Sequence, residues 1–175
     1  ESQTAEYLRL NSRGVVPTLV HEGLVIHESN VILEYLEDIF PELSLRPEEA
    51  FEKAQMRLWT KRLDEGHHDL ATASLSVGIA FRHQFLELGE EACLKLIEAV
   101  PDAVKRERRR DLIFHGLAAP VFQEAVRMWV ALVRDMDTVL NGRDWLVGNS
   151  YSLAEAAYTP YITRLDHLNL MGLLD

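Results

Sequence analysis

The sequence predicts a short α/β segment followed by a bundle of α-helices. Between residues 11 and 36, a glycine turn leads into two short apolar runs and then into a helical pattern. Later in the chain, segment 121–140 places its apolar residues on one broad stripe, which is typical of a helix at the centre of a bundle. A proline-containing linker at 41–47 separates the two patterns. We therefore expect one domain over residues 1–40 and a second over residues 48–175.

The first apolar run follows a Val16-Pro17 bond. Proline donates no backbone hydrogen bond and is rarely found inside a sheet, so we expect the strand to begin at Thr18. A bond before proline is one of the few that adopts the cis form, and a cis turn here would leave the N–H and C=O groups of Val16 facing outward. Those groups could pair with an extended, peptide-like ligand. A two-residue turn then leads to the return strand at 24–26.

A helix follows the hairpin, and Ser29 is its expected N-cap. The start of a helix carries unpaired N–H groups and a partial positive charge, so a ligand carboxylate is expected to bind beside the Ser29 hydroxyl. Glu28 is then placed to hold an ammonium group. Taken alone, Glu28 and Ser29 would be an ordinary helix cap. Together with the hairpin before them, they favour a site for an amino-acid head and its peptide tail.

Residues 11–36 resemble the glutathione-binding half of the glutathione transferase superfamily. The thioredoxin-like domain of that family carries Asn-Pro-x-Gly-x-Val-Pro-x-Leu, a hairpin, and then Glu-Ser before a helix. The resemblance implies that glutathione is the co-substrate and that Pro17 follows a cis bond. It also implies that Val16 pairs with the cysteinyl backbone of glutathione, while Glu28 and Ser29 bind its γ-glutamyl end.

The resemblance implies a thioredoxin-like N-terminal domain, present here only in its second half, followed by an all-α domain. Residues 5–10 read as the last turns of the helix that precedes this half. In the family, the first strand-to-helix turn supplies the serine, tyrosine or cysteine that acts on the glutathione sulfur. That turn is expected before Glu1, so the catalytic residue is unknown. Ser12 stands where the family usually has proline, a departure that affects only a turn.

The activity implied is that of a glutathione transferase, an enzyme that lowers the thiol pKa of glutathione and directs the thiolate at a small hydrophobic electrophile. Segments 28–36, 45–47 and 56–61 look closest to bacterial transferases similar to the glutathione-dependent β-etherases of lignin breakdown. Aryl ether cleavage, in aromatic degradation or detoxification, is therefore included in the expectation. The alternative is a non-catalytic glutathione-binding or protein-interaction module with the same fold. The family is commonly dimeric, and the helices after Ser29 and Glu48 are the expected contact of a homodimer.

The second domain carries one further local pattern. Ser152 and Glu155 have the spacing of a capping box, in which each side chain satisfies a backbone N–H at the other residue. The transferase family has a matching Ser-x-x-Asp box at the start of a buried helix, and Glu155 can replace the aspartate. The role predicted for this pair is structural. The other helices are expected at 48–70, at 71–88 either as a continuation of that helix or with a kink near Gly78, and at 90–100, 101–114 and 121–140.

His67 and His68 stand among acidic residues, and two roles are considered for them: binding a metal ion or contacting a substrate. A metal site would need ligands three or four residues apart on one helix face, whereas adjacent histidines point in different directions, so no metal is expected. In the resembled family this part of the first bundle helix borders the second substrate. The resemblance therefore implies that His67 or His68 lines the acceptor pocket.

The remaining chemistry-bearing residues are expected to be structural. The basic run at 105–110 is read as a solvated helix face, Cys93 as a small packed hydrophobe, and Trp59, Trp129 and Trp145 as core or interface residues.

Composition limits the classes of partner. The formal net charge of −10 argues against binding to nucleic acid or to an anionic membrane. No apolar run approaches the roughly 20 residues that span a bilayer, and the start of the sequence shows no signal-peptide pattern. One cysteine in 175 residues cannot form an internal disulfide, so a cytoplasmic location is expected.

Overall fold

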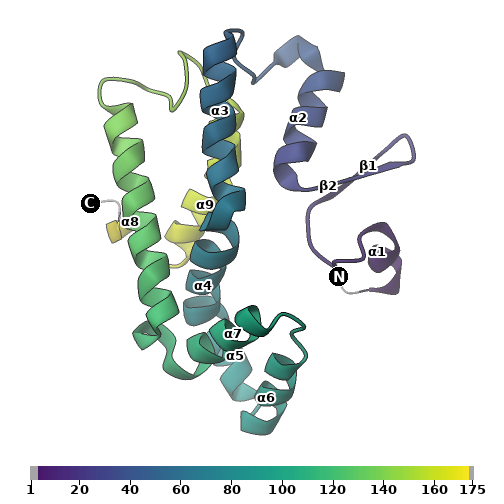
Figure 1. Ribbon diagram of the computed structural model, residues 1–175, viewed down its shortest axis with the longest axis vertical. Helices are drawn as coiled ribbons and strands as arrows, with labels where there is room; N and C mark the ends of the chain where they lie inside the picture. The colour runs from purple at the N-terminus through teal and green to yellow at the C-terminus, as the bar shows by residue number, and fades with distance from the viewer. Residues whose placement is uncertain (1–3, 174–175) are drawn as a thin grey trace.

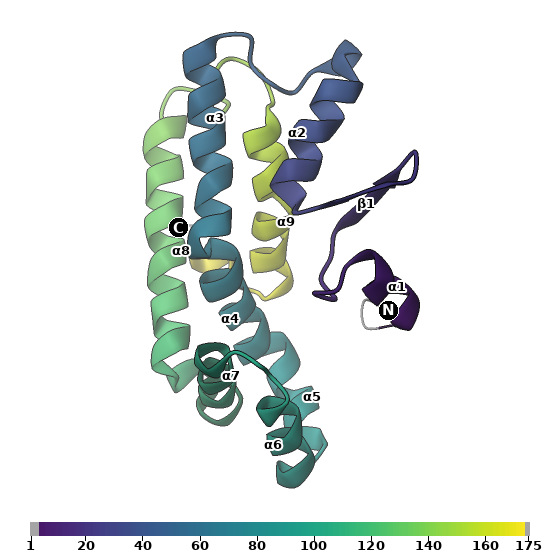
Figure 2. The ribbon, with the colours of Figure 1, turned by 45° about the vertical axis from the view of Figure 1, so that its right-hand side comes forward.

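A computed structural model describes residues 4–173, in which a small N-terminal lobe lies beside a long helical bundle (Figure 1). The lobe contains the first two helices and a hairpin. The bundle is built mainly on long, roughly parallel rods of helix, with shorter helices at its lower end (Figure 2). The elements of the lobe are α1 (Ala5–Leu10), β1 (Thr18–His21), β2 (Leu24–His27), α2 (Ser29–Ile39) and the single turn η1 (Pro41–Leu43).

The hairpin follows the predicted plan. The Val16-Pro17 bond is cis, and β1 begins directly after it. The two strands are antiparallel, and Thr18 at the start of β1 pairs with His27 at the end of β2. The two-residue turn uses positive φ angles, 49° at Glu22 and 80° at the glycine that follows it, as a tight hairpin requires.

The turn before the cis bond is held by a buried asparagine. Asn11 is only 2% exposed, and its Nδ2 donates to the carbonyl oxygen of Val15 at 2.9 Å and to Oγ1 of Thr18 at 3.2 Å. The hydroxyl of Tyr7, on α1, also donates to the Val15 carbonyl at 2.7 Å. Because two donors fix this carbonyl, the orientation of the following Val16 backbone is set by the lobe itself.

The bundle agrees with the predicted helices except in its first rod, which is the run of consecutive helical elements from residue 50 to residue 87. Its elements are α3 (Ala50–Arg62), η2 (Leu63–Thr72), α4 (Ala73–Ser76), η3 (Val77–Phe81), α5 (Arg82–Glu87), α6 (Glu90–Glu98), α7 (Ala103–His115), η4 (Gly116–Ala118), α8 (Pro120–Leu140), α9 (Leu153–His167) and η5 (Met171–Leu173). Helix α7 begins later than predicted because the Asp102 side chain caps it, accepting from the backbone N–H of Lys105 at 2.8 Å.

Of the two alternatives predicted for 71–88, the structure supports the continuation of the first rod, because helical backbone runs on through Gly78. The principal break in the first rod lies at Glu65 and Gly66, where Gly66 adopts a φ of 131°, and the rod is widened to a π-helix over η2 and again over η3. Gly78 lies within the second widened turn, where its role is close packing. A Cβ there would lie 2.7 Å from a ring carbon of Phe122 on α8, so no larger residue fits without movement.

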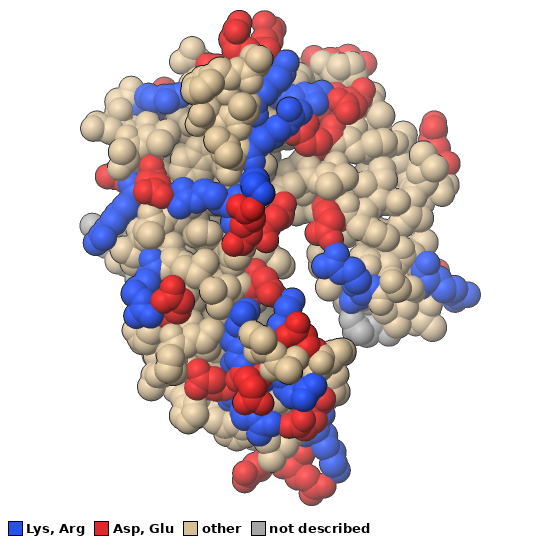
Figure 3. Space-filling model, in the orientation of Figure 1, with Lys and Arg blue, Asp and Glu red and all other residues tan. Residues whose placement is uncertain are grey.

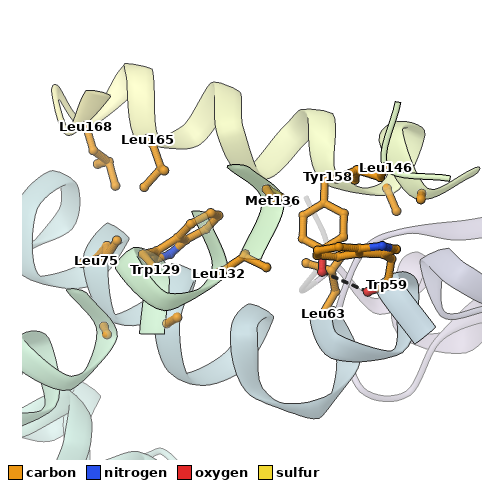
Figure 4. Close-up of a cluster of buried hydrophobic side chains, with 14 of the residues drawn as sticks. Trp59, Leu63, Leu75, Trp129, Leu132, Met136, Leu146, Tyr158, Leu165 and Leu168 are labelled. Carbon is orange, nitrogen blue, oxygen red and sulfur yellow. Dashed lines mark hydrogen bonds between the residues drawn. The ribbon is translucent and has the colours of Figure 1, made fainter. Parts of the chain in front are cut away.

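The main hydrophobic core joins the first rod to α8 and α9. Trp129 is fully buried and Trp59 is 8% exposed, as predicted, whereas Trp145 is half-buried and packs edge to face on Tyr151. The hydroxyl of Tyr158 donates to the Trp59 carbonyl at 2.9 Å across the core (Figure 4). The α8 stripe predicted from periodicity supplies its buried members Phe122, Ala125, Trp129, Leu132 and Met136.

The linker is fastened by a buried carboxylate. Glu37, near the end of α2, is 7% exposed and accepts from Ser44 Oγ at 2.6 Å, from the Leu45 N–H at 2.9 Å and from the Arg46 N–H at 3.2 Å. The Leu45 carbonyl in turn accepts from the N–H of Leu153 at the start of α9, at 3.0 Å. The lobe is therefore tied to the bundle at the end where the linker passes (Figure 1).

The capping box at the start of α9 is confirmed. Both Ser152 and Glu155 bond to the backbone at the other residue's position, and Glu155 Oε2 accepts the Ser152 N–H at 2.8 Å. Its second oxygen accepts the N–H of Leu146, nine residues earlier, at 2.7 Å. Glu155 thus also secures the loop between α8 and α9.

The basic run on α7 lies in a region of mixed charge and is paired with acidic residues (Figure 3). The expected solvated face is only partly correct, because most of the arginines in the run are half-buried. Lys105 and Arg108 both pair with Asp69, while Arg106 and Arg110 pair with Glu98. Cys93 is fully buried with two isoleucines in a separate small apolar cluster, which confirms its predicted role.

Over residues 4–173, each helix taken singly is too short or too polar to cross a membrane. Helices α7 and α8, with the turn η4 between them, satisfy the criterion of length and composition only as a pair, bent by 76°.

Candidate functional site

The hairpin register brings together the two halves of the predicted glutathione site, Val16-Pro17 and Glu28-Ser29. We call these four residues the glutathione clamp. Thr18 pairs with His27, so the residues just outside this pair, Pro17 and Glu28, follow at the same end of the ladder. Val16 is 70% exposed, and no hydrogen bond within residues 4–173 involves its backbone N–H or C=O. An exposed peptide edge therefore lies beside the N-terminus of α2.

The start of α2 differs from the prediction by one residue. Glu28, with a φ of 69°, is the N-cap, and Ser29 is the first helical residue, so the expected N-cap role of Ser29 was wrong. The Glu28 side chain makes no capping bond. The first N–H groups of α2 and the exposed Ser29 hydroxyl therefore remain at the helix end, which is the arrangement that binds a carboxylate.

Glu28 instead forms an ion pair with Arg13 in the turn before the cis bond. Both side chains are more than half exposed, so the pair contributes little stability and can exchange with a ligand charge. This contact puts a cation opposite the carboxylate that was predicted to hold an ammonium group. No local sequence pattern predicts this ion pair, because the two residues lie 15 positions apart.

The two predicted acceptor-pocket histidines point to different helices. His67 turns toward α8, where its Nε2 lies 3.3 Å from the Met128 carbonyl oxygen and its ring meets Trp129 edge to face. His68 is exposed and turns toward α9, where its Nδ1 lies 3.0 Å from the Tyr161 hydroxyl. The break at Gly66 directly precedes them and sets their orientation. Of the two, His68 is the better candidate for contact with a small molecule.

A second bridge connects α2 to the bundle beside this pair. Asn30, directly after Ser29, donates through Nδ2 to the Thr60 carbonyl at 3.0 Å and to Asp64 Oδ2 at 2.9 Å. Sequence reasoning missed both Asn30 and Tyr161. Asn30 could have been noticed from its place in the first turn of α2, whereas Tyr161 had no local signal because it lies 93 residues from its partner.

Two further features of the molecule concern a metal site and a hollow. Within the described part of the chain, no three His, Cys, Asp or Glu side chains are grouped so as to hold a metal ion. A hollow of about 340 Å³ lies between the end of α8, the following loop and α9, with Trp145, Tyr151 and Ile162 among its lining residues. It contains no residue of the predicted clamp.

Burial lowers the pKa of His67 below its ordinary value of 6.5, against the opposing effect of the Met128 carbonyl. The unfolded chain then takes up this proton at a higher pH than the folded chain does. The stability conferred by neutral His67 is complete above about pH 6.5 and is lost as the pH falls toward the lower, folded-state pKa. We expect the free energy of unfolding, from urea titrations between about pH 7 and pH 5, to fall less steeply in His67→Asn than in the parent.

The control for this prediction is Gln84→Asn, which changes an exposed residue of α5 that carries no titratable group. Its pH dependence should follow that of the parent. Identical slopes in the parent and in His67→Asn would contradict the assigned effect of burial.

The structure combines a cis-proline hairpin that leads into Glu-Ser at a helix start with a helical bundle that carries a capping box. This is the combination implied by the resemblance to glutathione transferases. The sequence model described as "Glutathione S-transferase, N-terminal domain" matches residues 1–39. The crystal structure of the beta-etherase LigF from Sphingobium sp. strain SYK-6 superposes with a TM-score of 0.77 at 30% identity, over 94% of this chain and 67% of that one. This chain belongs to the glutathione transferase superfamily.

Among curated proteins, the chain is 36% identical to Protein LigF of Sphingobium sp. (strain NBRC 103272 / SYK-6) over 160 residues. That match covers 89% of this chain and 61% of LigF, so the chain spans less than two thirds of this relative's length. Glutathione S-transferase U4 of Arabidopsis thaliana is 42% identical over 50 residues, which are 29% of this chain and 22% of that protein. Glutathione transferase F7 from Populus trichocarpa shares the fold at a TM-score of 0.63 and 20% identity, over 98% of this chain and 68% of that one.

Proposed function

We propose that this chain binds glutathione and is part of a glutathione transferase. The enzyme directs the glutathione thiolate at a small hydrophobic electrophile. One observation carries the proposal. The hairpin register sets the free peptide edge at Val16, next to the cis bond of Pro17, beside the open helix N-terminus at Glu28 and Ser29. A peptide-like ligand with an amino-acid head fits both halves at once.

Three groups of glutathione have a proposed partner in this arrangement. The γ-glutamyl carboxylate lies at the N–H groups of α2 and the Ser29 hydroxyl, where the helix dipole favours a negative charge. Its ammonium group approaches Glu28 and displaces Arg13 from the ion pair. The cysteinyl backbone pairs with the N–H and C=O groups of Val16.

The electrophile side is assigned to the bundle face that carries His68. The similarity to the beta-etherase LigF supports aryl ether cleavage as the reaction of the whole protein, in aromatic degradation or detoxification. The single cysteine supports a cytoplasmic location.

Binding of the donor can be tested directly. We expect the chain to be retained on immobilised glutathione and to be released by free glutathione. The tripeptide α-Glu-Cys-Gly moves the carboxylate and ammonium relative to the peptide tail, so it should release the chain less effectively. Passage through the column without retention, or equal release by both tripeptides, would contradict the proposed glutathione clamp.

We also propose that two copies associate through the outer faces of α2 and α3. Phe51 and Leu58 lie seven residues apart on α3 and are 74% and 55% exposed, and Val31 on α2 is 55% exposed. Residues seven apart share a helix face, so the two α3 residues form an apolar strip at the contact expected from the sequence.

Phe51→Asp should convert the chain to a monomer in sedimentation equilibrium, because the carboxylate would be desolvated in the contact. The matched control is Leu96→Asp, a similar change at a 46% exposed residue of α6. The mass of the control should equal that of the parent. A parent that is monomeric, or a Phe51→Asp variant that is still dimeric, would contradict this interface.

A further inference from the structure

One polar pair on the bundle lies outside the glutathione clamp. His68 in η2 and Tyr161 on α9 meet with 3.0 Å between Nδ1 and the hydroxyl oxygen, and their rings pack edge to face with centroids 5.9 Å apart. His68 is exposed, and Tyr161 is half-buried. The pair therefore combines a fixed hydrogen bond with an imidazole that solvent or a ligand can reach.

The pair belongs to the side of the bundle that faces the lobe. Asp64, which precedes His68 by four residues, accepts a hydrogen bond from Asn30 in the first turn of α2. Helix α9 also contacts α2, and Figure 2 shows it standing between α3 and α2. The space-filling view shows an open cleft between the lower part of the lobe and the bundle (Figure 3).

The protonation of Tyr161 limits what the pair can do. Burial, with the negative charge of Asp64, raises the pKa of Tyr161 to about 12, so its hydroxyl keeps its hydrogen near neutral pH. If that hydrogen is donated to Nδ1 of His68, the neutral imidazole must carry its own hydrogen on Nε2. Within residues 4–173, Nε2 of His68 has no hydrogen-bond partner.

We propose that Tyr161 fixes His68 in the tautomer with hydrogen on Nε2, and that this N–H binds an oxygen acceptor of an aromatic small molecule in the cleft. The inference rests on the proposed function, because it takes the cleft as the electrophile side of a glutathione site. The ring edges of His68 and Tyr161 offer apolar contact, and the N–H adds a directed hydrogen bond. The pair selects aromatic ketones and ethers over hydrocarbons of the same shape.

Nitrogen-15 NMR of the imidazole tests the positioning role of Tyr161. The parent should show the Nε2–H tautomer at His68, and Tyr161→Phe, which keeps the ring and removes the hydroxyl, should show a mixture of tautomers. Tyr151→Phe is the matched control, because its hydroxyl lies 3.5 Å from Thr159 Oγ1 and makes no contact with His68. An Nδ1–H tautomer in the parent, or unchanged signals in Tyr161→Phe, would overturn the assignment.

A pair of probes tests the binding role. Acetophenone and isopropylbenzene have nearly the same shape, but only acetophenone carries an oxygen acceptor. In NMR titrations of the parent, acetophenone should bind about fivefold to tenfold more tightly, which is the effect of one net hydrogen bond. His68→Phe should abolish this preference, and His68→Gln, which retains an N–H donor, should keep part of it. Equal affinities in the parent, or an undiminished preference in His68→Phe, would refute the proposal.

The same variants separate this inference from the proposed function. Retention on immobilised glutathione is measured in parallel, and His68→Phe should be retained like the parent because His68 is not part of the clamp. A parent that prefers acetophenone but is not retained would refute the glutathione site alone. A parent that is retained but shows no preference would refute the role given to His68 and Tyr161 alone.

Discussion

Ser29→Ala should weaken glutathione binding by about tenfold to about a hundredfold. The substitution removes a hydroxyl that donates to the γ-glutamyl carboxylate, and a hydrogen bond to a charged group contributes about 1.5 to 3 kcal/mol. Alanine is a good helix former, and Ser29 is the first helical residue rather than the N-cap, so the free energy of unfolding should stay close to that of the parent. Isothermal titration with glutathione measures the affinity, and urea unfolding measures the stability.

The matched control is Ser150→Ala, which removes a hydroxyl from an exposed residue in the loop before α9. Its affinity for glutathione should equal that of the parent. An unchanged affinity of Ser29→Ala for glutathione would contradict the role given to this hydroxyl. A large loss in the free energy of unfolding would show that the residue acts in folding.

Glu155→Ala should lower the free energy of unfolding by about 3 kcal/mol, more than Ser152→Ala, for which about 1 kcal/mol is expected. The reason lies in the number of partners lost. The Glu155 carboxylate accepts from the N–H of Leu146, from the N–H of Ser152 and from the Ser152 hydroxyl, at 2.7, 2.8 and 2.6 Å. Removing it leaves two backbone donors without partners at residues that are almost fully buried.

Urea or thermal unfolding followed by circular dichroism measures this loss, which corresponds to a shift in melting temperature of about 6 to 12 °C. Glu124→Ala is the control, because Glu124 pairs with Arg127 on the exposed face of α8 and such pairs contribute little. If Glu155→Ala were no more destabilising than Ser152→Ala, the bond to Leu146 would have no energetic weight.

The features predicted correctly depend on residues that are close in sequence. A proline bars a strand from starting before Thr18, a two-residue turn fixes the hairpin register, and a serine three residues before a glutamate makes a capping box. The error at Ser29 has the same local scale. Glu28 adopts a positive φ directly after β2 and is the N-cap, so the helix begins at Ser29, one residue earlier than expected.

Helix α8 and the first rod show what local sequence patterns can and cannot predict. Periodicity identified the buried stripe of α8, because a broad apolar face can be buried only against other helices. It did not locate the break in the first rod. Both Gly66 and Gly78 are compatible with a kink, and the packing of Phe122 against Gly78 is a contact between residues far apart in the chain.

The sequence by itself determined the family, the hairpin with its cis bond, the open start of α2 and the capping box. Tertiary structure alone decided that Arg13 neutralises Glu28, that Glu155 also holds Leu146, and that His67 and His68 part toward α8 and α9. The physical reason is the range of the interactions. Turns, caps and helix faces are set by neighbouring residues, whereas the partner of an exposed or half-buried polar side chain is chosen by the packing of distant elements.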